Sequence, residues 1–299
     1  MPVTETIPLC APARTDITNT GFTMPAHACD CHAHVFTQAR EASLVSDRSY
    51  TPPPASLGAY RHLLSTLGFS RGVIVQPSVY GTDNSVTLNA VADGGDNFRA
   101  VVVVGEDISM TELRAMHAAG ARGARVNLLF RSSAQINNMQ ISNLKSLAAK
   151  LAELGWHLQL LIDVSQFADL YSALTDLPVP TVFDHMGHMP VQQGINQPGF
   201  QAMLRLISEG KSWAKLSGSY RFTGQQEAPY SDVTAFARTI IAANPDQVVY
   251  GSDWPHPHFD IPMPEDGALL NMLPDWAPDA HLRQKILADN PARLYDFPA

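Results

Sequence analysis

The chain has 299 residues, 45% of them hydrophobic, which is enough for one large core. Its formal net charge is -8 at pH 7 and its isoelectric point is about 5.7, which argues against nucleic acid or an acidic lipid surface as a partner. No apolar run reaches the roughly 18 residues of a membrane span. Residues 1–26 lack the continuous apolar segment of a secretory signal.

Eight short apolar or β-branched runs recur along the chain, mostly separated by amphipathic segments such as Thr111–Ala119, Ile141–Glu153 and Gly199–Ser208. Strands alternating with helices predict an α/β protein with parallel strands and helical crossovers. Eight repeats are typical of a single-domain (β/α)8 TIM barrel, which we expect over residues 26–299 after an extended N-terminal arm, residues 1–25. An open, doubly wound sheet is the alternative. The predicted strands are His27–Phe36, Arg71–Ser78, Arg99–Gly105, Gly123–Leu129, Trp156–Asp163, Val179–His185, Trp213–Arg221 and Gln247–Asp253.

The first predicted strand carries the densest polar pattern of the chain. Asp30, His32 and His34 stand at alternate positions, which would place them on one face of the strand. Two imidazoles on one face can grip a metal ion or hold a polarised carbonyl group. Cys29 and Cys31 would lie on the opposite face, as small apolar side chains packed between strand and helix.

The chain contains three cysteines, because Cys10 joins the pair on the first strand. An odd number without disulfide-type spacing suits a reducing compartment. We therefore expect a cytoplasmic protein.

Polar side chains also follow most of the later strands at their carboxyl ends, where the active groups of such a barrel lie. His185 ends the sixth strand and Asp253 ends the eighth. The remaining candidates are hydroxyl, amide and guanidinium groups near the ends of strands one, two, four and seven: Tyr50, Ser78, Arg125, Asn127, Arg131 and Arg221.

Some polar residues also have a structural interpretation. Ser78 could cap a helix, and Arg131 could be a solvated loop charge. We interpret His157, at the start of strand five, as structural. We expect Asp184 to face outward, because its parity is opposite to that of His185. Three further histidines are interpreted as loop, rim or surface residues: His188, His256 and His258.

His32-Ala33-His34, His185 and Asp253 together resemble the amidohydrolase superfamily. Within it, the chain is similar to the branch of 2-pyrone-4,6-dicarboxylate lactonases, sulfomuconolactone hydrolases and galactarolactone isomerases. The similarity runs from about Ala28 to Arg293, and its most specific segments are Asp30–Phe36, Gln76–Asn84, Asp184–Gly187 and Gly251–His256. The arginines Arg125, Arg131 and Arg221 resemble the carboxylate-binding set of the dicarboxylate lactonase.

The chain departs from the metal-dependent members of that superfamily, which carry a lysine or glutamate bridge on strand four and a metal-binding histidine on strand five. Strand four offers Arg125 and Asn127 instead, and strand five offers Gln159, Leu161 and Asp163. Nearby arginines would repel a cation, and the resembled branch works without metal, so we expect no cofactor. One divalent metal such as zinc, held by His32, His34 and Asp253, is the alternative.

These residues predict a hydrolase that opens the ester ring of a di- or polycarboxylate lactone. Asp253 would activate water, while the imidazoles of His32, His34 and His185 would polarise the carbonyl group and stabilise the oxyanion. The three arginines would bind a small-molecule anionic substrate, since guanidinium forks match carboxylates. Ser78, Tyr50 and Asn127 would add hydrogen bonds.

Other functions fit the same residues. An intramolecular lactone isomerase would direct a substrate hydroxyl at the carbonyl instead of water. A mononuclear zinc-dependent amidase, esterase or decarboxylase would use the metal set. A non-catalytic sugar-acid binder would have no need for the base Asp253. The oligomeric state is left open, because the predicted outer helix faces show no distinct interface pattern.

Overall fold

The computed structural model describes residues 7–37, 44–129, 141–167 and 169–298. Eight parallel strands form one sheet, and neighbours in the sheet follow the order of the sequence. The predicted Arg131 lies outside the described residues. The strands are β1 Cys29–Ala33, β2 Arg71–Val75, β3 Phe98–Val102, β4 Ala121–Asn127, β5 His157–Leu161, β6 Thr181–Phe183, β7 Ser212–Leu216 and β8 Val248–Tyr250.

The sheet closes on itself between β1 and the residues that follow β8. The backbone N–H of Asp253 donates to the carbonyl of His32 at 2.8 Å, and that of His34 donates to the carbonyl of Trp254 at 2.8 Å. Ala33 and Trp254 form the parallel bridge between them. The predicted (β/α)8 barrel is confirmed, each predicted strand overlaps an observed one, and the open sheet is excluded.

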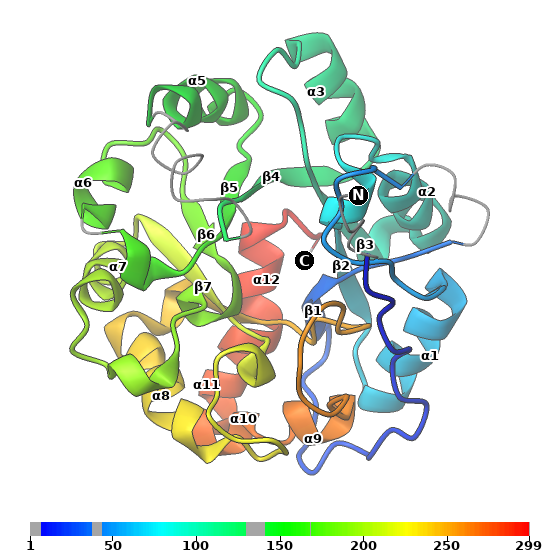
Figure 1. Ribbon diagram of the computed structural model, residues 1–299, viewed down its shortest axis with the longest axis vertical. Helices are drawn as coiled ribbons and strands as arrows, with labels where there is room; N and C mark the ends of the chain where they lie inside the picture. The colour runs from blue at the N-terminus through cyan, green and yellow to red at the C-terminus, as the bar shows by residue number, and fades with distance from the viewer. Residues whose placement is uncertain (1–6, 38–43, 130–140, 168, 299) are drawn as a thin grey trace, which may run out of the picture.

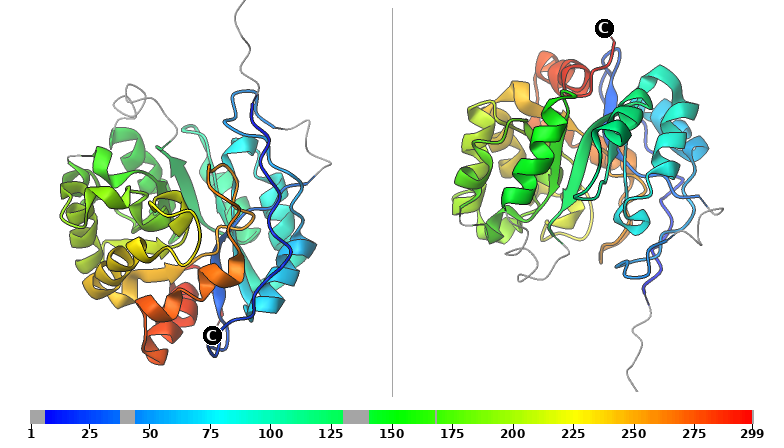
Figure 2. Two further views of the ribbon diagram at one scale, coloured as in Figure 1. Left: turned by 60° about the horizontal axis from the view of Figure 1, so that its bottom comes forward. Right: turned by 90° about the horizontal axis from the view of Figure 1, so that it is seen from above.

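Helices surround the ring of strands (Figures 1 and 2). The side chain of Ser56 accepts from the N–H of Ala59 at the start of α1, and Ser109 and Glu112 form a capping box at the start of α3. None of the helices in the described ranges combines the length and apolar character needed to cross a membrane. The helices are α1 Leu57–Leu67, α2 Ser85–Gly94, α3 Met110–Ala118, α5 Ile141–Ala152, α6 Leu170–Leu174, α7 Pro198–Ser208, α8 Thr234–Ala243, α9 Asp266–Leu270, α10 Leu273–Trp276, α11 Ala280–Gln284 and α12 Asn290–Leu294.

The described part of the N-terminal arm has almost no regular secondary structure. Residues 7–28 form no helix or strand beyond an isolated bridge between Leu9 and Thr51. The side chain of Thr20 donates to the carbonyl of Leu67, at the end of α1, at 2.9 Å. The boundary of the arm at residue 25 stays a prediction.

Part of the barrel interior is filled by a cluster of mostly small and branched side chains from six of the eight strands. The C-terminal residues Tyr295 and Phe297 pack into the same cluster. The guanidinium groups of Arg71 and Arg99, near the start of β2 and β3, lie 5.1 and 4.6 Å from the Phe297 ring centre. The C-terminal tail therefore covers the amino-terminal end of the barrel. The strand residues of this cluster are Cys29, Cys31, Val73, Val75, Val101, Val182, Trp213 and Val249.

A bulge in β1 overturns the predicted alternation of its side chains. Asp30 pairs with Gly72, but the next pair is Ala33 with Ile74, so β1 contains one extra residue. Asp30 faces α1, where the hydroxyl of Tyr60 donates to its Oδ2 at 2.9 Å. The cysteines before and after Asp30 point into the barrel interior and not toward a helix, and His32 turns inward past the bulge.

Candidate active site

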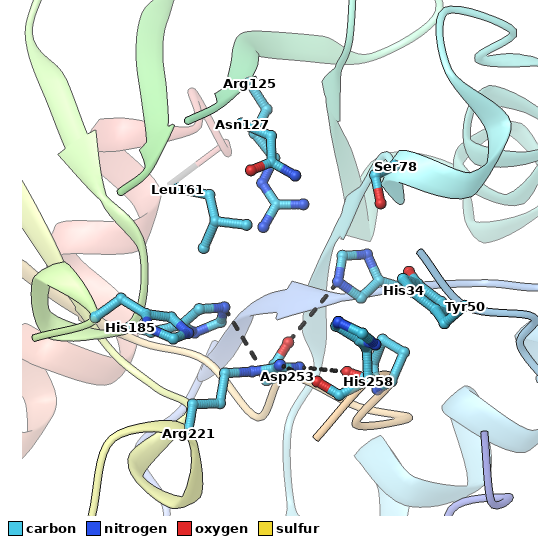
Figure 3. Close-up of a pocket in the computed structure, with 12 residues that line it drawn as sticks. His34, Tyr50, Ser78, Arg125, Asn127, Leu161, His185, Arg221, Asp253 and His258 are labelled. Carbon is cyan, nitrogen blue, oxygen red and sulfur yellow. Dashed lines mark hydrogen bonds and ion pairs between the residues drawn. The ribbon is translucent and has the colours of Figure 1, made fainter. Parts of the chain in front are cut away.

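A cavity opens at the carboxyl end of the barrel, where the sequence predicts the active groups. It measures about 370 Å³ when its open mouth is counted. Figure 3 shows its side chains converging from several strands around the ring. It is lined by His34, Tyr50, Ser78, Arg125, Asn127, Leu161, His185, His188, Arg221, Asp253, Pro257 and His258.

Asp253 is fully buried at the base of this cavity and its two oxygens have different environments. Oδ2 accepts hydrogen bonds from the hydroxyl of Tyr220 and from Nε of Arg221, both at 2.6 Å. Oδ1 has no hydrogen-bond partner among the described residues. It lies 3.7 Å from Nε2 of His32 and 3.8 Å from Nε2 of His34. One oxygen is thus anchored, and the other faces imidazoles.

The backbone holds this arrangement in a conformation that few residues adopt. Asp253 has a φ of 67° and His185 a φ of 49°, both in the left-handed region that disfavours residues with a Cβ. A Cβ at Gly251 would lie 2.6 Å from Cβ of His32, and one at Gly218 would lie 2.7 Å from Nδ1 of His185. Glycine at these two positions therefore lets the two imidazoles approach Asp253.

The three imidazoles differ in what their other ring nitrogen contacts. Nδ1 of His34 donates to the carbonyl of Val75 at 2.7 Å, so Nε2 of the neutral ring carries a lone pair. Nδ1 of His185 lies 2.9 Å from the hydroxyl of Ser217, which can donate to it and leave the proton on Nε2. Nε2 of His185 lies 3.8 Å from Oδ2 of Asp253.

Asp184 faces into the barrel, which corrects the prediction that it faces outward. Its Oδ2 accepts from Nε of Arg125 at 3.0 Å and from Nε2 of Gln159 at 3.1 Å. Its Oδ1 lies 3.3 Å from Nδ1 of His32 and 3.6 Å from Nζ of Lys215. Asp184 continues the inward parity of β6. The positive φ of the next residue turns the chain, so that two successive side chains both reach the interior.

Lys215 is a buried cation that the sequence analysis did not identify. Its Nζ donates to the carbonyl of Cys31 at 2.9 Å and to Oε1 of Gln159 at 2.7 Å, and it lies 3.4 Å from Nδ1 of His32. His32 therefore has a donor, Lys215, and an acceptor, Asp184, at the same nitrogen. With Lys215 as the donor to Nδ1, the ring proton of His32 lies on Nε2, whereas Oδ1 of Asp184 makes no hydrogen bond within the described residues.

Charge and burial set the protonation states of the site. Burial raises the pKa of Asp253, but it lies well below its usual range, and the charge of Arg221 is the first of the influences that lower it. Burial lowers the pKa of His34 and of His185 well below the ordinary value, and that of His32 is also lowered. The imidazoles are consequently neutral at pH 7 and the carboxylate is ionised.

The cluster as a whole has an excess of positive charge. Three cations, Arg125, Lys215 and Arg221, face two carboxylates, Asp184 and Asp253, which leaves one positive charge in the buried site. An anionic ligand would balance it, since an unpaired buried charge is unfavourable.

The predicted substrate-binding residues are brought together, apart from Arg131, which is not described. The guanidinium of Arg125 points into the cavity, and Tyr50, Ser78 and Asn127 also line it (Figure 3). Besides its bond to Asp253, Arg221 donates from Nη1 to the carbonyl of His258 at 3.1 Å and from Nη2 to that of Pro257 at 2.9 Å. Three of its five N–H groups are used in these bonds.

Of the three histidines interpreted as loop, rim or surface residues, two lie at the cavity, and the interpretation is wrong for His256. His188 and His258 line the cavity, and the ring of His258 stacks on Tyr50 with centroids 5.3 Å apart. His256 is fully buried. His256 and His258 follow Asp253 by three and five residues, but this spacing alone does not distinguish a buried histidine from one at the rim. His157 is the first residue of β5 and packs against Tyr295, away from the cavity.

His32, His185 and Asp253 offer ligand atoms that lie within 4.8 Å of one another. This set has His185 where the sequence analysis expected His34. Its donor types suit zinc, and Nε2 of His32 has no hydrogen-bond partner within the described ranges. The set could therefore hold one divalent ion. The excess positive charge, with Arg221 bound directly to Asp253, opposes it.

The sequence matches the family model described as Amidohydrolase over residues 29–297. It is 38% identical over 283 residues to a 2-pyrone-4,6-dicarboxylate hydrolase of Comamonas testosteroni, with 92% of each chain covered. It is 35% identical over 293 residues to a 4-sulfomuconolactone hydrolase of Hydrogenophaga intermedia, covering 97% of this chain and 96% of that one. A D-galactarolactone isomerase of Agrobacterium fabrum is 31% identical over 248 residues, with 82% and 83% covered.

Proposed function

The chain belongs to the amidohydrolase family, and from this we propose that it is a carboxylic-ester hydrolase that opens the ring of an anionic lactone with water. The observation that supports the proposal is that the two carboxylate oxygens of Asp253 have different environments. Its Oδ2 is anchored by Tyr220 and Arg221, while its Oδ1 faces the cavity without a hydrogen bond from a described residue. A carboxylate held in this way can accept a proton from a bound water.

His34 supports the nucleophile in this proposal. Its Nδ1–H is committed to Val75, so its Nε2 accepts and cannot donate to an oxyanion. A water held by Oδ1 of Asp253 and Nε2 of His34, which lie 3.8 Å apart, would have an acceptor for each of its protons. This assigns His34 to water orientation, which differs from the carbonyl-polarising role expected from the sequence.

His32 and His185 supply the hydrogen-bond donors for the oxyanion. With Lys215 donating to Nδ1 of His32 and Ser217 donating to Nδ1 of His185, both Nε2 atoms carry protons. Water attacks the lactone carbonyl carbon and gives its proton to Asp253, and the oxyanion forms beside the two Nε2–H groups. The ring C–O bond then breaks, and the leaving oxygen takes the proton back from Asp253.

Arg125 and Arg221 provide the affinity for an anion. The guanidinium of Arg125 points into the cavity, and Arg221 has two N–H groups beyond those bound to Asp253 and the Pro257 and His258 carbonyls. The excess positive charge of the cluster favours at least one carboxylate on the substrate. The names of both similar hydrolases also specify anionic substrates, a dicarboxylate and a sulfonated lactone.

The proposal needs no metal, because neutral imidazoles supply the donors and the local charge disfavours a cation. Should a divalent ion bind, His32, His185 and Asp253 would hold it, and it would polarise the carbonyl group as a Lewis acid.

Intramolecular isomerisation is the second candidate, favoured by the similarity to a D-galactarolactone isomerase. The same base could take a proton from a hydroxyl of the substrate instead of water. The two reactions differ in their products, since hydrolysis releases acid and isomerisation conserves the lactone.

The test is acid release, followed at constant pH, from di- and tricarboxylate lactones. Matched methyl esters of the same lactones serve as the neutral controls. We expect release from one or more of the anionic lactones and at least about 10-fold lower kcat/KM for its ester, from the loss of a charge-assisted hydrogen bond. Equal rates on both would remove the anion requirement. A new lactone without acid release would establish the isomerase instead.

A further inference from the structure

A chain of three hydrogen bonds runs from Asp253 away from the cavity. The hydroxyl of Tyr220 lies 2.6 Å from Oδ2 of Asp253 and 3.2 Å from Nδ1 of His256. Nε2 of His256 in turn lies 3.0 Å from Oδ1 of Asp266, at the start of α9. All four side chains are buried, and the exposed fraction of each residue is 3% or less.

These three contacts need more hydrogens than the neutral groups can provide. Tyr220 supplies one hydrogen and a neutral His256 supplies one, but each of the three contacts needs its own. A carboxylate at each end can only accept. The chain therefore holds a third hydrogen, which lies between His256 and Asp266. Whichever of these two groups holds it, Nδ1 of His256 is left to donate to the hydroxyl of Tyr220.

Reversing the direction of the chain does not remove this requirement. If Tyr220 donated to Nδ1 of His256, its oxygen and Oδ2 of Asp253 would face each other at 2.6 Å without a hydrogen between two acceptors. Oδ2 of Asp266 has no hydrogen-bond partner within the described residues, so this buried carboxyl group depends on His256 for its side-chain hydrogen bond.

A backbone hydrogen bond also connects the loop that carries His256 to the proposed base, Asp253. The N–H of His256 donates to the carbonyl of Asp253 at 2.8 Å. His256 has a φ of 59°, a strained value like that of Asp253. The other charged groups nearby are Arg221, which binds the carbonyls that follow His256, and Glu265, whose carboxylate accepts backbone N–H groups at the start of α9.

We propose that Tyr220, His256 and Asp266 are positioning residues for the reaction of Asp253. His256 and Asp266 fix the hydroxyl of Tyr220 as a donor to Oδ2, so that only Oδ1 is available as the base. The proposal rests on the proposed role of Asp253. None of the three residues is among those that line the cavity, as far as the described residues show, so their effect should fall on kcat and not on KM.

Two substitutions of His256 separate this role from simple packing. In His256→Asn, the amide nitrogen takes the place of Nδ1 and can still donate to Tyr220. In His256→Gln, the amide reaches the position of Nε2 and can contact only Asp266. We expect Tyr220→Phe to lower kcat by about 10-fold or more, and His256→Gln by about 3- to 10-fold, with KM within about 2-fold. His256→Asn should recover most of the activity that His256→Gln loses.

Coupling between the variants and a spectroscopic measurement complete the test. The Tyr220→Phe, His256→Gln double variant should be no slower than Tyr220→Phe alone, because His256 acts through Tyr220. Nitrogen-15 NMR of histidine-labelled protein, with the His256 signals assigned from their loss in His256→Asn, should show a proton on Nδ1. Tyr60→Phe is the matched control, since it removes another buried tyrosine donor, to Asp30, and should leave kcat within about 3-fold.

An unchanged kcat in Tyr220→Phe, equal rates for the two His256 variants, or an Nδ1 of His256 without a proton in the NMR spectrum would each overturn the proposal. If the wild-type protein hydrolyses no lactone at all, the proposed function fails by itself. The NMR measurement then still decides whether Nδ1 of His256 donates to the hydroxyl of Tyr220.

Discussion

Replacing Asp253 by asparagine removes the base while keeping the shape of the site. The amide oxygen can still accept from Tyr220 and Arg221, which bind Oδ2 in the wild type. General-base catalysis contributes about 100- to 10,000-fold, or about 3 to 5 kcal/mol of barrier. We therefore expect kcat to fall by that factor. The excess charge of the buried cluster would rise from one positive charge to two, so KM for an anionic lactone should stay the same or decrease.

The assay is initial-rate kinetics on an anionic lactone that the wild type hydrolyses, with the dissociation constant of the ring-opened product measured in parallel. Asp163→Asn is the matched control. Asp163 follows β5 at the same end of the barrel and caps a short turn through Ser165, a role that asparagine can fill. Its kcat should stay within about 2-fold. A kcat for Asp253→Asn within about 10-fold of wild type would refute Asp253 as the base.

Three further changes test other parts of the account. Arg125→Met should raise KM for an anionic lactone by about 10- to 100-fold through loss of a charge-assisted hydrogen bond, and an unchanged KM would contradict its role. Lys215→Met should lower kcat by about 10-fold or more, because His32 loses the donor that keeps its proton on Nε2; a normal kcat would show that the oxyanion does not depend on this tautomer. Burial raises the pKa of Asp30 from 3.8 to about 6, against hydrogen bonds from Ser252, His32 and Tyr60. The folded state thus binds this proton more tightly than the unfolded state, and the resulting stabilisation, complete below about pH 4, is lost as the pH rises to about 6. Asp30→Asn should therefore gain about 3 kcal/mol relative to wild type between pH 4 and 7 in urea unfolding, whereas parallel pH profiles would refute this assignment.

The fold and the members of the site follow from local sequence patterns. Alternating strand and helix signals suffice to predict eight parallel strands, and parallel strands bring their carboxyl ends together. His34, His185 and Asp253 could therefore be placed in one cavity although they lie far apart in the sequence. The topology alone places the end of each strand near this cavity, whereas the catalytic roles of these residues stay predictions.

The orientation of individual side chains depends on backbone irregularities, such as bulges and left-handed residues, that the amino-acid pattern does not predict. Asp30 and His32 are two residues apart and would share one face of a regular strand, but the bulge in β1 places them on different faces. Asp184 keeps the inward parity of β6, and the left-handed conformation of His185 lets His185 turn inward beside it. His256 follows Asp253 in a loop that folds back into the interior, and nothing in its neighbouring residues distinguishes a buried histidine from one at the rim.

The central claim is that water opens an anionic lactone here without a metal. The most direct measurement is to run chelator-treated enzyme in water enriched in oxygen-18 and to analyse the products by mass spectrometry. We predict one heavy oxygen in the new carboxylate for each turnover, at a rate that chelation does not change. A product without the label would contradict hydrolysis, and a rate lost on chelation and restored by zinc would contradict the metal-free site.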